Sequence, residues 1–230
     1  MTHSLKILLT ALVLTLPLQA WSSRFHEIQT RSALGMVPRS MKKFLMSHPQ
    51  ALVEGARGIP NDQVPSVEDV EAQFQRILRM SEEKRHPETL VRELGTLAHL
   101  VQLLSDPSAI RGVTPLREHF EAYADELTKH LVVTSEPYWA TKGPLDARPT
   151  LLRSATTKFH RHAVLLAQFD ESTRQRTGSW DLRSLPFAQL QLSFSEGVNL
   201  TANLWTLAWR ATGDLWIAPE NSLPSTSAID

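Results

Sequence analysis

Two residues near the start of the chain could bind a metal ion through nitrogen atoms. Trp21 and His26 are five residues apart. If processing leaves Trp21 as the first residue, its free α-amine and its carbonyl lie near an imidazole one turn into a helix. Amine, carbonyl and imidazole groups together suit a zinc ion. The alternative is that Trp21 belongs only to the processing boundary and that His26 is a surface residue of a helix.

A second histidine stands in an apolar stretch. Leu100 and Leu103 surround His99 with apolar side chains, so we expect His99 inside a helical bundle. Gly95, one turn earlier, leaves room for a group close to the helix. A histidine in such a place is either a metal ligand or a hydrogen-bonded core residue, and the local sequence leaves both open.

Composition limits the remaining possibilities. The 230 residues include no cysteine, which excludes disulfide scaffolds, thiol nucleophiles and Cys-ligated zinc or iron–sulfur sites. Lys and Arg together number 24, as do Asp and Glu, so net charge favours neither nucleic acid nor an anionic membrane. Any metal must therefore be held by His, Asp, Glu or backbone groups.

The first 20 residues predict a secretory signal peptide. Lys6 precedes an apolar run from Ile7 to Leu16, and Ala20 supplies a small residue for cleavage. The run is well short of the roughly 20 residues that a membrane-spanning helix needs. We expect a bacterial protein that is secreted or periplasmic after cleavage near Ala20, with no integral membrane segment in the mature chain.

Helical periodicity dominates the rest of the chain, and no stretch shows sustained strand alternation. The pattern predicts an all-α multi-helix bundle, one domain over residues 21–218, and a disordered tail over 219–230. A chain with this apolar content is expected to be a monomer. The predicted helices lie near residues 24–34, 38–48, 66–83, 88–104, 115–132, 150–169 and 185–211.

Several short stretches follow one another in a recognisable order. They are Trp21 with His26, Gly55-Ala-Arg-Gly-Ile-Pro-Asn-Asp62, Leu94-Gly-x-x-x-His99-x-x-Gln with Pro107, Arg117-Glu-His119-Phe-Glu121-Ala-Tyr123, and Leu200-Thr-Ala-Asn-Leu-Trp-Thr-Leu-Ala-Trp209. Their order and spacing resemble the superfamily of bacterial zinc-dependent phospholipase C and the fungal single-strand nucleases. The last two stretches look like its bacterial branch, and the resemblance covers most of residues 21–211.

This resemblance implies a fold and an activity. Members of the superfamily are exported helical bundles that bind up to three zinc ions and hydrolyse phosphoesters. By resemblance, Trp21 and His26 would hold one ion, and Asp62 and His99 a second. Asp62 would also be the base that positions the attacking water. The implied substrates are small phosphodiesters, phospholipids or single-stranded nucleic acid.

The chain departs from the superfamily pattern after His99. Leu103 stands where a bridging Asp is expected, and Ala109 stands where another His is expected. Asp106 is two turns beyond His99 and is the candidate replacement ligand. Because Pro107 biases Asp106 away from helical geometry, the alternative is a residue of the C-terminal turn.

Later histidines complete the candidate ligands. His160 and His162 lack the carboxylate expected four residues on, and they lie about 200° apart on a helix, so at most one binds. His162 is the candidate of the two. His119 is either a ligand or part of a solvated helix face. His48, His86 and His130 have no partner in the pattern.

Three functions are compatible with these residues. The chain is a zinc-dependent phosphoester hydrolase with one or two ions, or a degenerate relative that binds a lipid, peptide or protein without catalysis, or an exported structural helix bundle whose resemblance is coincidental. Loss of a bridging carboxylate removes both a bond and a negative charge. Leu103 therefore argues against a full three-ion cluster.

Overall fold

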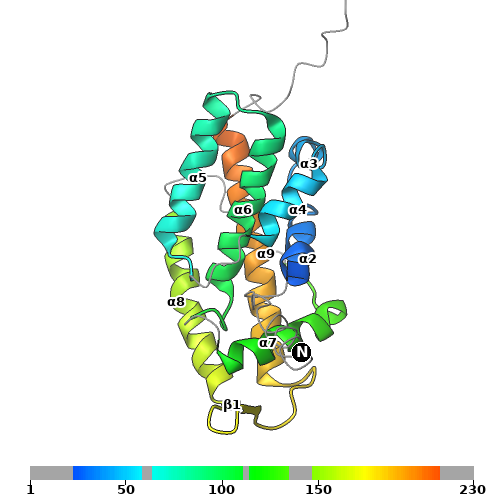
Figure 1. The fold of residues 1–230 in the computed structure, drawn as a ribbon, viewed down its shortest axis with the longest axis vertical. Coiled ribbons are helices and arrows are strands. Elements are labelled where there is room, and N and C mark those ends of the chain that lie inside the picture. The colour runs from blue at the N-terminus through cyan, green and yellow to red at the C-terminus, as the bar shows by residue number, and fades with distance from the viewer. Residues whose placement is uncertain (1–22, 59–63, 111–113, 135–146, 213–230) are drawn as a thin grey trace, which may run out of the picture.

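The computed structural model describes residues 23–58, 64–110, 114–134 and 147–212, and this part of the chain is predominantly helical, as predicted (Figure 1). The predicted signal peptide and the predicted tail lie outside the described residues. The helices are α2 Ser23–Ala33, α3 Arg39–Leu45, α4 Pro49–Arg57, α5 Val67–Glu82, α6 Pro87–Ser105, α7 Pro115–Leu127, the 3-10 helix η1 Thr128–His130, α8 Ala147–Leu166 and α9 Leu185–Thr212.

Helices α6 and α9 form the centre of the bundle. Helix α6 packs against α4, α5, α8 and α9, and α9 also contacts α2, α5 and α8 (Figure 1). Trp205 of α9 is fully buried, and its indole N–H donates to the carbonyl of Leu94 on α6 at 2.9 Å. This hydrogen bond joins the two most apolar helices. None of the described helices is long and apolar enough to cross a membrane.

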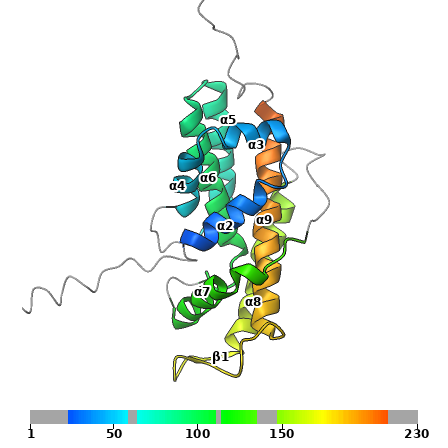
Figure 2. The ribbon, with the colours of Figure 1, turned by 90° about the vertical axis from the view of Figure 1, so that its right-hand side faces the viewer.

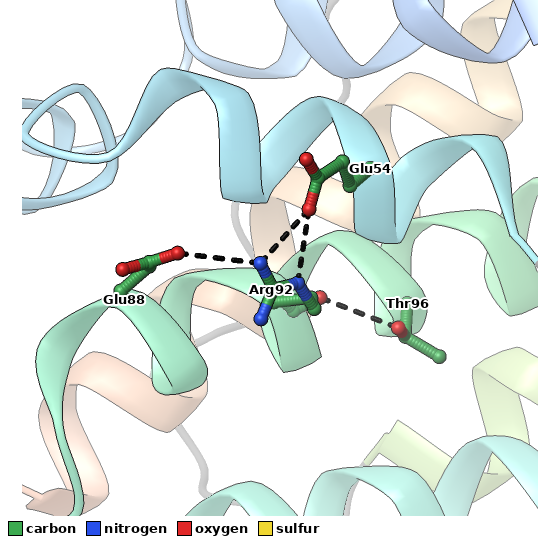
Figure 3. A network of polar contacts seen from close by, with 4 residues as sticks. All are labelled: Glu54, Glu88, Arg92 and Thr96. Carbon is green, nitrogen blue, oxygen red and sulfur yellow. Dashed lines mark hydrogen bonds and ion pairs between the residues drawn. The ribbon is translucent and has the colours of Figure 1, made fainter.

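Helices α4 and α6 approach each other unusually closely. A Cβ atom added to Gly55 would lie 2.0 Å from the carbonyl oxygen of Arg92, and one added to Gly95 would lie 2.3 Å from that of Leu52. Two glycines, one on each helix, therefore let the backbones touch. At the solvent edge of the crossing, Arg92 donates to Glu54 at 2.8 Å (Figure 3).

The predicted helix ends are largely confirmed. Ser66 and Asp69 form the capping box expected at the start of α5. Helix α6 ends at Ser105, and Asp106 has an extended ψ of 112°, as expected for the residue before Pro107. Helix α7 begins at Pro115 as predicted.

Several local elements differ from the prediction. Helix α7 ends at Leu127 rather than near residue 132, and the 3-10 helix η1 follows it. Helix α4 was not predicted, because Gly55 and Pro49 both disfavour a helix, yet proline fits the first turn of a helix. Helix α8 begins at Ala147 rather than near residue 150, with Pro149 in its first turn. A short hairpin pairs β1 Phe169–Asp170 with β2 Gln175–Arg176, and the carboxylate of Asp170 accepts from the backbone of Ser172 in its turn.

Candidate metal centre

His26 lies on the buried face of α2 and is inaccessible to solvent. Its Nδ1 is 2.7 Å from Oε1 of Gln102 on α6. The amide nitrogen of Gln102 donates to the hydroxyl of Thr30 at 3.0 Å. Because Oε1 can only accept a hydrogen bond, the imidazole proton of His26 is on Nδ1. In the neutral form of the ring, Nε2 then carries the lone pair.

His99 projects from α6 toward the end of α4. Its Nδ1 donates to the carbonyl of Ala56 at 3.1 Å, which again leaves the lone pair on Nε2. Gly58, which follows α4, has φ 70° and ψ 178°, a conformation essentially restricted to glycine. A Cβ atom at Gly58 would lie 2.3 Å from Nε2 of His99. Only glycine can therefore pass over this ring.

The two histidines that the resemblance assigned to different ions lie side by side. Their ring centroids are 4.4 Å apart, with 54° between the ring planes. Ring centroids of two imidazoles that share one tetrahedral zinc ion would be about 5 Å apart, so the observed separation is close to that of a shared pair. In both residues Nδ1–H donates to an oxygen, the arrangement that orients metal-binding imidazoles.

The imidazole of His99 is neutral near pH 7. Burial lowers its pKa from 6.5 to about 4, the hydrogen bond to Ala56 opposes this shift, and the charge of Arg117 adds to it. A metal ligand must be unprotonated. The lowered pKa therefore keeps His99 competent to bind a cation even in mildly acidic solution.

We expect the same shift to make the protein sensitive to acid. Between pH 6.5 and pH 4 the unfolded chain binds a proton at His99 that the folded chain does not, so the stability present above pH 6.5 falls as the pH decreases. The loss is about 3 kcal/mol at most, and less where solvent reaches the partly exposed ring. Urea unfolding of zinc-free protein from pH 7.5 to 4.5 measures it. The variant His99→Gln should lose less stability over this range, and an equal loss in both proteins would contradict the prediction.

The other candidate ligands do not complete this pair. Trp21 and Asp62 lie outside the described residues. The ring of His119 packs against that of Phe169 in the hairpin, with 5.3 Å between the ring centroids. The hairpin lies at the end of the bundle opposite α3 (Figure 2). Within the described part of the chain, no three His, Asp or Glu side chains are arranged to hold one ion. The described residues therefore bring His26 and His99 together without a third candidate ligand.

Asp106 and His162 lie at the end of α6. Asp106 is fully buried, and its Oδ1 accepts from the backbone and the hydroxyl of Ser108 at 2.8 and 2.7 Å. His162 donates from Nδ1 to the carbonyl of Pro107 at 2.8 Å. These contacts fix the turn after α6. They match the alternative stated for Asp106, a residue of the C-terminal turn.

Two buried cations near this turn were not predicted. Lys158 of α8 is 3% exposed, and its ammonium donates to the carbonyl of Leu103 at 2.9 Å. Burial lowers the pKa of Lys158 to about 8, while the charge of Asp106 opposes this shift. Arg117 of α7 is 2% exposed and donates to Glu121 at 2.9 Å. The spacing of the buried α8 residues Leu151, Ser154, Lys158 and Leu165 was the available signal for Lys158.

The structure also brings His48 and His86 together, which the sequence pattern did not indicate. Their ring centroids are 6.2 Å apart, and each residue precedes the proline that begins its helix, α4 or α6. The N-terminal ends of helices carry partial positive charge and disfavour a cation. This pair is therefore a poorer metal site than His26 and His99.

Comparisons of the chain with models of protein families, with curated proteins and with solved structures found no match.

Proposed function

We propose that this protein is an exported zinc-dependent phosphoester hydrolase with a reduced metal complement. The observation that carries the proposal is the facing pair His26 and His99, in which each Nδ1–H is held by an oxygen and each Nε2 carries the lone pair. Two imidazoles fixed in this tautomer are the usual nitrogen ligands of zinc. On this proposal Trp21 supplies a third ligand, a fourth position stays open to water, and Asp62 is the base.

A bound zinc ion would polarise a phosphoryl oxygen and lower the pKa of a bound water toward neutrality. The chain's own residues would provide the rest. The carboxylate of Asp62 would accept the proton of the attacking water. His26 and His99 would bind the ion through Nε2. Candidate substrates are phospholipid head groups, single-stranded nucleic acid and small phosphodiesters.

The buried cations support one ion rather than three. The ammonium of Lys158 is bonded to the carbonyl of Leu103, the residue at the expected bridging position. Arg117 lies close enough for its charge to lower the pKa of His99. Each fixed positive charge disfavours a further divalent cation nearby. Because these charges disfavour bound metal ions, they also favour a second candidate function, a helical binding protein without catalysis.

The experiment that tests the proposal is the zinc content of protein exported through its own N-terminal segment, measured by plasma mass spectrometry. Hydrolysis assays follow with phosphatidylcholine vesicles, single-stranded DNA and bis(p-nitrophenyl) phosphate. We expect about one zinc per chain, with turnover of at least one substrate that a chelator abolishes. Zinc-loaded protein inactive on all three would favour the binding protein. Protein that binds no zinc would exclude the hydrolase as proposed.

A further inference from the structure

Gln102 links two buried parts of the bundle. It is inaccessible to solvent on α6, and its side chain lies between His26 and Thr30 of α2. Its backbone carbonyl accepts from the hydroxyl of Ser105 at 2.9 Å. Thr30 is 1% exposed. The chain of contacts from Thr30 through Gln102 to His26 is therefore shielded from water.

The orientation of the amide determines where the imidazole proton lies. A histidine exposed to water exchanges between its two neutral tautomers, and a hydrogen-bond partner at one nitrogen selects one of them. In the structure the amide nitrogen of Gln102 donates to Thr30, and the amide oxygen, which can only accept, faces His26. Reversal of the amide would place an N–H group against Nδ1 and would move the imidazole proton to Nε2.

We propose that Gln102 is a positioning residue that holds His26 in the Nδ1–H tautomer and thereby presents Nε2 to a metal ion. The tautomer of His26 can be measured in zinc-free protein. The claim that Nε2 of His26 binds a metal ion rests on the proposed function. A neutral amide fixes the ring without adding negative charge behind it. Thr30 contributes by anchoring the amide, and buried partners of this kind are costly to leave unpaired.

The test reads the tautomer directly in zinc-free, ¹⁵N-labelled protein at pH 7.5. Long-range ¹H–¹⁵N spectra distinguish protonated from unprotonated ring nitrogens, and His26→Gln identifies the His26 signals. We expect wild-type His26 to be protonated at Nδ1. In Gln102→Met the signals should shift toward the Nε2–H form. His99 is the internal control, because its partner is the carbonyl of Ala56.

Zinc affinity provides the second readout. We expect Gln102→Met to bind zinc about ten- to a hundredfold more weakly than wild type. Gln102→Glu, whose carboxylate still accepts from Nδ1–H, should retain both the tautomer and the affinity, which a simple packing role would not require. Gln102→Asn is too short to reach His26 and replaces Gln102→Met if circular dichroism shows the latter unfolded.

Two results would overturn the inference in different ways. An unchanged Nδ1–H tautomer in Gln102→Met, or in Gln102→Asn, would show that Gln102 only packs against His26. Wild-type protein that binds no zinc would overturn the proposed function together with the metal part of this inference. Because the first result is obtained without metal, the two failures are distinguishable.

Discussion

Replacement of His99 by glutamine in the exported, zinc-loaded protein is expected to reduce phosphodiester turnover about a hundredfold or more and to lower the zinc content. The variant removes one of the two imidazoles whose centroids are 4.4 Å apart. Loss of a ligand should cost more than loss of its supporting hydrogen bond, which typically costs ten- to a hundredfold. Turnover and zinc content are measured on the same preparation at pH 7.5.

The matched control is His119→Gln. This change also removes an imidazole, but the His119 ring packs on Phe169 and makes no close pair with another described histidine. We expect its turnover and zinc content to stay near wild type. A His99→Gln protein that folds, keeps its zinc and turns over substrate normally would show that the His26 and His99 pair is not the metal centre.

The largest loss of stability is expected for Gly55→Ala and Gly95→Ala. A methyl group at either position would lie within 2.3 Å of a carbonyl oxygen of the facing helix. Such contacts cannot be relieved by rotating a side chain, because the neighbouring atoms belong to the backbone. Overpacking of a core typically costs 1–3 kcal/mol, and we expect about 3 kcal/mol or more here. Urea unfolding followed by circular dichroism measures the change.

Gly35→Ala is the control for these two variants. Its added Cβ atom would meet only the carbonyl oxygen of Ser32 at 3.2 Å, so a shift of a few tenths of an ångström accommodates it. We expect a change below about 1 kcal/mol. If Gly55→Ala and Gly95→Ala proved equally mild, the helices α4 and α6 would not cross at the observed distance. The crossing matters for the site, because it brings the carbonyl of Ala56 to His99.

Much of the fold follows from local sequence patterns. Apolar residues at helical spacing predicted most of the helices, and proline positions predicted where α6 ends and α7 begins. The sequence pattern did not predict helix α4, because glycine and proline have a low intrinsic helix propensity. Tertiary contact overrides that propensity here: the same Gly55 that weakens α4 in isolation permits its close approach to α6.

The residue types at the candidate site were determined by the sequence, but their grouping was not. Sequence identified His26 and His99 as candidates and placed them with different ions, whereas the packing of α2 against α6 brings their rings together. Gln102 and Lys158 gain their roles only through contacts with residues more than 50 positions away. Periodicity tells which face of a helix is buried, but the partner across that face depends on how the helices cross.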